Sequence, residues 1–167
     1  MKLIHGDGIV LAFEGYEAQL LDDLTGELKR LLSADLPKLE PVTARLFPDA
    51  YETLEDERAF RDLVGNDLRS AKLEAVETVR DHLSDGDQTR ALSEANIDAW
   101  LRVLTDIRLA IGTRLDVTDE TMEQDPDPDD PDGPALSVLH WLGWVQGMML
   151  DALNNQSGNP QTDEERQ

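Results

Sequence analysis

The segment QDPDPDDPDG (124–133) carries the residue types best suited to hold a metal ion, with five Asp and three Pro among its ten residues. Three aspartates match the first three ligand positions of an EF-hand calcium loop: Asp125, Asp127 and Asp129. The match fails at the sixth position, where glycine is required and Asp130 stands, and at the twelfth, where glutamate is required and Leu136 stands. We therefore expect an exposed, extended and mobile linker, because its charges repel one another and its prolines stiffen it.

Other residue patterns that could support catalysis or metal binding are missing from the sequence. The three histidines, His5, His82 and His140, lie far apart, whereas a metal site needs at least three convergent ligands. The absence of cysteine excludes disulfides, thiol nucleophiles and thiolate metal ligands. Neither a nucleophile elbow nor a phosphate-binding glycine loop occurs. We therefore expect no catalytic residues, no metal and no cofactor, and we predict that the protein is not an enzyme.

Four basic residues lack the local acidic partner that most arginines of this chain have. No acid stands three or four positions away from any of them: Arg69, Lys72, Arg108 and Arg114. They could pair across the fold with acids from other helices and so support the structure. They could instead form a small positive pocket that binds an anion or an acidic peptide. Both interpretations are open at the level of sequence.

A run of seventeen residues without formal charge, PALSVLHWLGWVQGMML (134–150), interrupts an otherwise acidic sequence. At helical spacing, part of this run forms one ridge: Trp141, Trp144, Val145 and Met148. A helix that is apolar on most sides lies either in the centre of a core or against another chain. Because Trp and Met are enriched at interfaces, Trp141, Trp144 and Met148 are also candidates for a partner or dimer face. The run is too short and too interrupted by polar residues for a membrane span, so we expect a soluble, cytoplasmic protein.

The charge balance limits the classes of partner. Asp and Glu total 36 against 15 Lys and Arg, which gives a net charge of −21. Such a surface repels phosphate backbones, because nucleic-acid affinity rests on Lys and Arg neutralising phosphates. Direct DNA binding is therefore disfavoured, no membrane contact is expected, and a basic protein partner fits better. The acidity is also consistent with a well-solvated surface or with a salt-adapted organism.

The elements that must position these residues are mainly helical. Apolar residues recur every three or four positions in four long stretches: 14–33, about 55–83, 93–112 and the segment from Pro134. Shorter helical pieces are expected at 42–47 and 118–123. Two short strands, Ile9–Phe13 and Gln88–Leu92, could pair as a ribbon. Gly112 is expected to end the third long helix in a left-handed conformation.

These elements predict a fold of the mainly α class. We expect a single domain, 1–153, built as a bundle of about four principal helices with a minor two-stranded β-ribbon. The acidic segment 124–133 forms a loop within this domain. The tail, 154–167, is expected to be disordered because its composition is polar and rich in Asn, Gln and Glu.

Several motifs occur in one order along the chain. They are GIVLAFEGYEAQLL (8–21), LxPDAY (46–51), DLRxxK (67–72), WLRxLxDxRLAxGTRL (100–115) and LSVLHWLGWVQGMMLDAL (136–153). In these motifs the chain resembles the AosR-like oxidative-stress regulators, an actinobacterial family formerly described as a domain of unknown function. The resemblance spans most of the chain and implies a cytoplasmic, largely helical transcriptional regulator. It also implies contact with a stress sigma factor and control of cysteine-biosynthesis genes, with a cysteine pair as the redox switch.

The chain departs from that pattern in one respect, because it contains no cysteine and thiol sensing cannot operate in it. We therefore expect a non-enzymatic intracellular regulator that acts by protein–protein contact, possible partners being a sigma factor or another basic protein. One alternative is direct DNA binding through a helix-turn-helix-like pair near 55–83 or 93–112. Another is a structural homodimer joined through 134–153. An enzyme acting on an anionic small molecule near Arg69 and Arg108 is the last alternative.

Overall fold

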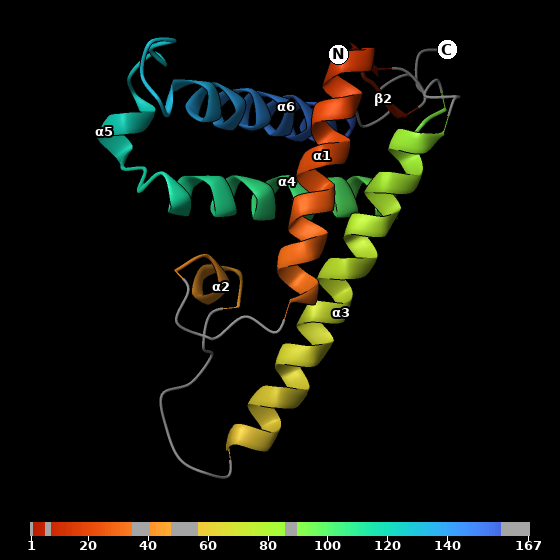
Figure 1. The fold of residues 1–167 in the computed structure, drawn as a ribbon. Helices are drawn as coiled ribbons and strands as arrows, with labels where there is room; N and C mark the ends of the chain where they lie inside the picture. The colour runs from red at the N-terminus through yellow and green to blue at the C-terminus, as the bar shows by residue number, and fades with distance from the viewer. Residues whose placement is uncertain (1, 6–7, 35–40, 48–56, 86–89, 158–167) are drawn as a thin grey trace, which may run out of the picture.

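The computed structural model of the protein describes residues 2–5, 8–34, 41–47, 57–85 and 90–157. Within these ranges the elements are β1 (Lys2–His5), β2 (Ile9–Ala12), α1 (Gly15–Ser33), α2 (Pro41–Leu46), α3 (Glu57–Ser84), α4 (Glu94–Arg114), α5 (Asp119–Met122) and α6 (Gly133–Ser157) (Figure 1). The described part of the chain is mainly helical, as the sequence predicts. None of its helices combines the length and the apolar character that a membrane span requires.

The two strands form an antiparallel ribbon at the N-terminus. β1 pairs with β2 in a register that places Leu3 opposite Leu11 and Ile4 opposite Val10. The predicted strand at 9–13 is therefore present, but the prediction that it pairs with 88–92 is wrong, because its partner is β1. From that segment, Leu92 donates one backbone hydrogen bond to the carbonyl of Ile9 (2.7 Å), and residues 88 and 89 lie outside the described residues. A hairpin to the preceding strand closes a far shorter loop, which costs less chain entropy.

α1 and α3 pack against each other along most of α1. The first turn of α1 is closed by a capping box, in which the backbone N–H of Glu14 donates to the Glu17 carboxylate (2.9 Å). Gly26 faces the side chain of Arg80 from α3, because a Cβ there would stand 3.2 Å from Nη1 of Arg80. The same guanidinium donates to the backbone carbonyl of Asp22 (3.0 Å). The glycine that weakens α1 thus makes room for an interhelical arginine.

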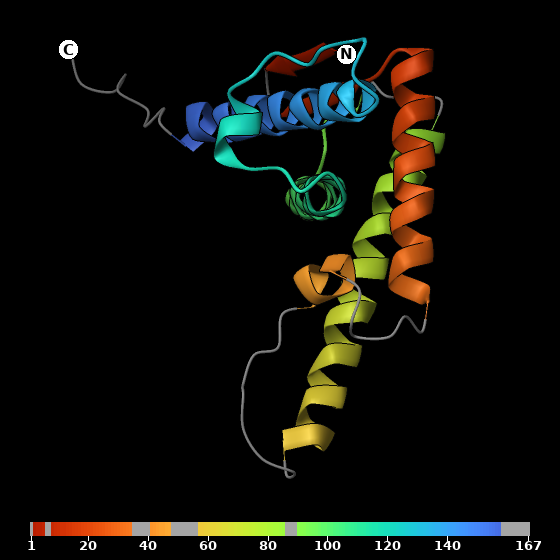
Figure 2. The ribbon, with the colours of Figure 1, turned by 60° about the vertical axis from the view of Figure 1, so that its left-hand side comes forward.

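The long helices cross rather than run along one axis. In Figure 1, α4 lies across the steep pair formed by α1 and α3. In Figure 2, α4 is seen nearly end-on while α6 is seen from the side, so α4 also crosses α6. α4 packs against α1, α2, α3 and α6. The predicted mainly helical class is confirmed, but the long helices cross one another instead of running side by side as in a bundle.

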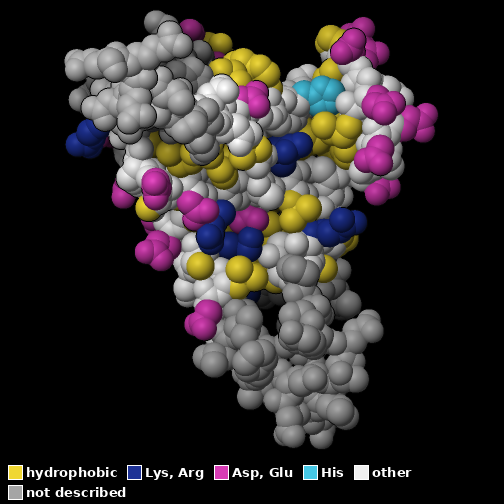
Figure 3. All heavy atoms as spheres, turned by 180° about the vertical axis from the view of Figure 1, so that it is seen from behind, with side chains coloured by type: hydrophobic (Ala, Val, Ile, Leu, Met, Phe, Trp, Pro, Cys, Tyr) yellow, Lys and Arg dark blue, Asp and Glu magenta, His cyan; other side chains and the backbone are white. Residues whose placement is uncertain are grey.

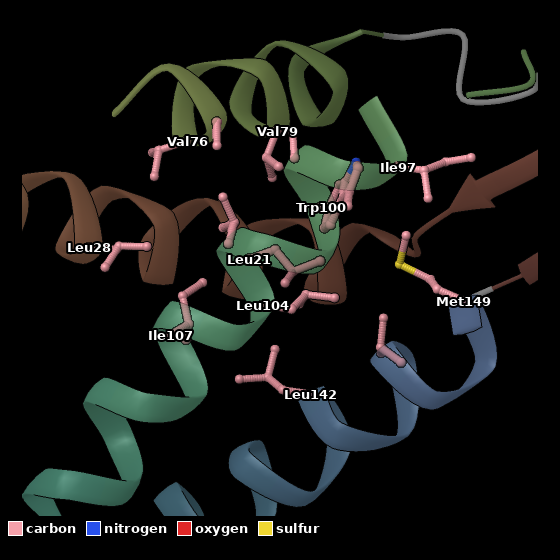
Figure 4. Close-up of a cluster of buried hydrophobic side chains, with 14 of the residues drawn as sticks. Leu21, Leu28, Val76, Val79, Ile97, Trp100, Leu104, Ile107, Leu142 and Met149 are labelled. Carbon is pink, nitrogen blue, oxygen red and sulfur yellow. The ribbon is translucent and has the colours of Figure 1, made fainter. Parts of the chain in front are cut away.

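The hydrophobic core surrounds the N-terminal half of α4. Trp100 is fully buried at its centre, and Ser93 caps the helix by accepting a hydrogen bond from the backbone N–H of Asn96 (3.2 Å). Figure 4 shows side chains from four helices converging there: Leu21 and Leu28 of α1, Val76 and Val79 of α3, Ile97, Leu104 and Ile107 of α4, and Leu142 and Met149 of α6. The central helix of this protein is therefore α4, and α6 covers one side of it.

The end of α4 differs from the prediction. The helix continues through Arg114, and no described glycine has a positive φ. The left-handed residue is Asp116, with a φ of 49°. Asp tolerates this conformation better than most residues, so it can replace the expected Gly112 in turning the chain. The carbonyl of Gly112 accepts from the backbone N–H of Val117 (2.9 Å), which closes the turn.

The acidic loop is folded into tight turns rather than extended. The side chains of Asp127 and Asp130 accept hydrogen bonds from the backbone N–H groups of Asp129 (3.0 Å) and Asp132 (2.8 Å). These are Asx turns, in which an aspartate mimics a backbone turn. A Cβ at Gly133 would collide with the carbonyl oxygen of Asp127, so glycine is needed where the loop meets α6. The prediction of an exposed segment is confirmed for its aspartates, and that of an extended one is wrong.

The C-terminal helix is longer than predicted at both ends. α6 begins at Gly133, one residue before Pro134, and continues through Ser157. Residues 154–157, which were expected to begin the disordered tail, are therefore helical. Helical hydrogen bonding can carry a helix past its last apolar contact. The rest of the predicted tail, 158–167, lies outside the described residues.

Candidate functional site

Lys72 is paired with an acid from another helix. Its Nζ on α3 lies 2.6 Å from Oδ1 and 2.8 Å from Oδ2 of Asp106 on α4. The two side chains are only 18% and 9% exposed, so this ion pair is largely removed from water. The structure therefore gives Lys72 the cross-fold partner that one interpretation of the sequence expects. Asp106 belongs to the core of the α3–α4 contact rather than to the outer face of α4.

The other basic candidates on these helices lie in separate places. Nη1 of Arg114 is 3.8 Å from the carboxylate of Glu27 on α1, and both side chains are about half exposed. The guanidinium of Arg69 lies 5.3 Å from the centre of the Phe47 ring, a cation–π contact. Arg69, Lys72 and Arg114 thus contact three different residues in three different parts of the fold, and they are not among the residues that line the hollow beside Arg108.

Arg108 has a different environment from the other three. Its Nη1 donates to Oε1 of Gln146 on α6 (2.7 Å), and the Nε2 of Gln146 donates in turn to Oγ1 of Thr105 (2.7 Å). The guanidinium lies against α6 at Gly143, where a Cβ would stand 3.4 Å from Nη2. Its Nε is buried and has no hydrogen-bond partner within the described part of the chain. Arg108 therefore joins α4 to α6 through a neutral amide instead of an acid.

Arg108 lines a hollow of about 810 Å³ between α2, α4, α5 and α6. The lining is mixed: Pro41, Arg45, Thr105, Arg108, Leu109, Gly112, Thr113, Asp116, Val117, Met122, Leu139 and Gln146. Arg45, at the exposed end of α2, is a basic lining residue that the sequence analysis missed. Its place beside the hollow depends on how α2 packs against α4, which no spacing within the 42–47 piece predicts.

The apolar ridge predicted on α6 divides between core and surface. Val145 and Met149 are fully buried, whereas the side chain of Trp144 is 53% exposed. Trp141 is half-buried against the core and Met148 is half-buried. The exposed Leu150 lies further along the helix. α6 is therefore both a core helix and a source of exposed apolar surface, with Trp144 the most exposed of the three ridge candidates.

Acidic side chains gather beside this helix. In Figure 3 they collect at the right-hand edge of the molecule, on the side where α5 lies, while Lys and Arg side chains lie nearer the centre. The loop that precedes α6 contributes exposed aspartates to this region: Asp125, Asp127, Asp129, Asp130 and Asp132. Within the ranges that the structure describes, no group of three or more His, Asp or Glu side chains is placed to hold a metal ion.

A buried polar contact links α3 to the core tryptophan. The Nε1–H of Trp100 donates to Nδ1 of His82 (3.0 Å), and the two rings meet edge to face. Burial lowers the pKa of His82, and the nearby carboxylate of Asp85 opposes that shift only in part. His82 also lines a smaller polar hollow of about 270 Å³, together with Asp81 and Arg90. The neutral imidazole is the form that accepts the tryptophan hydrogen bond.

The fold and these contacts define a small, mainly helical protein with an exposed tryptophan on its C-terminal helix and no metal-binding cluster among its described residues. A family model described as a domain of unknown function, DUF2017, matches residues 2–153. The chain therefore belongs to the DUF2017 family. This finding agrees with the resemblance to AosR-like proteins that its motifs indicate.

Curated relatives with a name of their own are found in mycobacteria. The chain is 27% identical to a protein named "Oxidative stress regulator AosR" from Mycobacterium tuberculosis (strain ATCC 25618 / H37Rv), over 78% of this chain and 75% of that protein. The protein of the same name from Mycobacterium bovis gives the same values. An AosR protein of Mycobacterium leprae (strain TN) is 28% identical over 83% of this chain and 79% of its own length. No solved structure matches the chain.

Proposed function

We propose that this protein is a non-enzymatic regulator in the response to oxidative stress and that it acts by binding another protein. The names of the mycobacterial relatives support the stress role. The match to the family over residues 2–153 makes a shared role reasonable for the whole helical domain. The chain has no cysteine, so it cannot itself sense an oxidant through a thiol.

The observation that carries the proposed protein contact is the outward face of α6. Trp144 is 53% exposed there, although Trp is a residue that proteins usually bury. Met148 lies one turn further on and Asp151 nearly two turns further on, so all three share one face. An exposed Trp with a half-buried Met and an acidic side chain beside it suits a partner with an apolar recess bordered by Lys and Arg.

A basic protein surface is a better partner than DNA for the same electrostatic reason. DNA binding requires free Lys and Arg side chains to meet phosphates. Three basic residues of the two helices proposed to read DNA already contact carboxylates: Lys72 with Asp106, Arg102 with Asp98 and Arg114 with Glu27. A region of a sigma factor is one basic partner of the required kind. A homodimer through α6 is the second candidate, since Trp144 and Leu150 are both exposed on that helix.

A genetic experiment tests both the proposed stress role and the proposed protein contact through the outward face of α6. The gene is deleted in the organism that encodes it, and the transcript response to hydrogen peroxide is compared after complementation with wild type, Trp144→Ala or Tyr16→Ala. Tyr16 is a matched control, because it is an exposed aromatic residue, 72% exposed, on a different helix. Circular dichroism of the purified variants shows whether each one folds.

We expect the deletion to change the peroxide response, Tyr16→Ala to restore it and Trp144→Ala to fail while remaining folded. A deletion strain with an unchanged response would contradict the stress role. Full restoration by Trp144→Ala would contradict the proposed face. Light scattering on the purified protein separates the homodimer, which would give a dimeric mass that Trp144→Ala reduces to that of a monomer.

A further inference from the structure

Arg108 is a cation whose charge is not matched by the fold. In a chain with a net charge of −21, acids outnumber basic residues by 36 to 15, and Lys72 and Arg114 each contact one. Arg108 contacts the neutral amide of Gln146 instead, and no described carboxylate lies within ion-pair distance of its guanidinium. Removing a charge from water without a counter-charge is costly, so a half-buried arginine of this kind is suited to binding an anion.

The hydrogen bonds of Arg108 point to the same conclusion. Gln146 accepts from Nη1, and Gln146 is itself held by Oγ1 of Thr105, so one edge of the guanidinium is fixed. The buried Nε donor has no partner in the described part of the chain. Buried donors are rarely left unsatisfied, so this one needs an explanation. The hydrogen bond to Gln146 fixes the orientation of the guanidinium beside the hollow.

The hollow beside Arg108 has the size and lining of a small-molecule site. Its volume, about 810 Å³, lies in the range of about 300–1,000 Å³ that is usual for ligand pockets. One part of its lining is apolar, with Leu109, Val117, Met122 and Leu139. Arg108 and Arg45 supply positive charge from α4 and α2, and Asp116 is the one acidic residue among the described residues of the lining. The net charge of these described lining residues is therefore positive in a strongly acidic protein.

We propose that this hollow binds a small molecule that carries one carboxylate or phosphate group on a short apolar body. The anionic group meets Arg108 and Arg45, and the apolar body lies against the leucines, Val117 and Met122. Arginine suits such a group because its fork of N–H donors matches two oxygens at once. This site is independent of the outward face of α6, so it stands even if the proposed protein contact fails.

The test uses three probes that share a six-carbon body: hexanoate, hexyl phosphate and 1-hexanol. Each is titrated into the purified full-length chain at constant ionic strength, and binding is followed by backbone amide NMR shifts and calorimetry. The variants are Arg108→Gln and Arg45→Gln. Arg102→Gln is the matched control, because Arg102 also lies on α4 but is exposed, pairs with Asp98 and does not line the hollow.

We expect saturable binding of hexanoate or hexyl phosphate, with shifts at Gly112, Thr113 and Leu139, and at least about tenfold weaker binding of 1-hexanol. Arg108→Gln should weaken binding of the anion by about tenfold or more, and Arg102→Gln should leave it unchanged. Because Arg45 is exposed, Arg45→Gln should fold normally and still weaken binding, which keeps the test valid if Arg108→Gln fails to fold. The proposal is overturned if neither anionic probe binds saturably, or if affinity is unchanged in the folded arginine variants.

Discussion

The two sides of α4 give a largely buried cation opposite environments, one with a carboxylate partner and one without. On the α3 side, Lys72 finds the carboxylate of Asp106 and forms a largely buried ion pair. On the α6 side, Arg108 donates a hydrogen bond to the amide oxygen of Gln146, lies against Gly143 and lines the hollow. Neither residue has an acid three or four positions away in the sequence, so the sequence does not distinguish them. The comparison shows what the sequence can and cannot predict. The absence of an acid three or four positions away identifies cations that need a partner distant in sequence. Only the tertiary packing determines whether an acid of this protein supplies that partner.

The largest effect is expected from breaking the α3–α4 pair. Lys72→Met leaves the buried carboxylate of Asp106 without a counter-charge and should lower the free energy of unfolding by about 3 kcal/mol or more. Urea denaturation measures this change. The matched control is Lys29→Met, because Lys29 pairs with Glu77 while both side chains are about half exposed, and it should cost less than about 1 kcal/mol. Equal losses in the two variants would contradict a structural role for the Lys72 pair.

A smaller effect is expected on the other side of α4. Arg108→Met removes one hydrogen bond to Gln146 but also removes a cation that has no described counter-charge. The two changes oppose each other, so the free energy of unfolding should change by less than about 1.5 kcal/mol. The same urea experiment measures it. A loss as large as that of Lys72→Met would show that Arg108 is a structural residue, and it would remove the contrast between the two sides.

The α3–α4 contact also predicts a dependence of stability on pH. Burial lowers the pKa of His82 below its ordinary value of about 6.5, so the unfolded state binds a proton more readily than the folded state. The stabilisation that His82 provides is therefore full above about pH 6.5 and is lost as the pH falls below it. His82→Gln keeps an acceptor for Trp100 without titrating. Urea midpoints between pH 5 and pH 8 should fall less in His82→Gln than in wild type, and parallel curves would contradict the assignment.

The smallest effect is expected from the exposed pair at the end of α4. Arg114→Gln breaks a contact of 3.8 Å with Glu27 in which both side chains are about half exposed. Water and salt screen such a pair, so the free energy of unfolding should fall by less than about 0.5 kcal/mol. Thermal unfolding at low and at high salt measures it. A larger loss that disappears in high salt would mean that this contact is stronger than its exposure indicates.

The helices were predictable because their apolar residues repeat at helical spacing. Ser93 and Thr118 cap the helices that follow them, as their positions predict. The errors lie where local chemistry decides between alternatives. Asp116, rather than Gly112, adopts the left-handed conformation, and the side chains of Asp127 and Asp130 fold a loop that their charge alone suggests should be extended. The strand partner of β2 was missed because its apolar pattern does not specify which neighbour it pairs with.

The candidate site was predictable only in part. The sequence identifies Arg108 and Trp144 as residues of interest, but it groups Arg108 with Arg69, Lys72 and Arg114, which contact other residues elsewhere. Arg45 was missed because its place beside the hollow depends on how α2 packs against α4. The crossing of α4 by four other helices determines which cation meets an acid and which faces a hollow. The spacing of residues within one helix therefore cannot predict which of these cations meets an acid.

The central claim is that the outward face of α6 binds another protein, and site-specific photocrosslinking tests it most directly. A photoreactive phenylalanine analogue replaces Trp144 in one strain and Tyr16 in another, and both are irradiated before and after peroxide treatment. We predict a crosslinked adduct at position 144 whose second component is a basic protein, and no such adduct at position 16. No adduct at position 144, or an adduct only with a second copy of this chain, would contradict the claim.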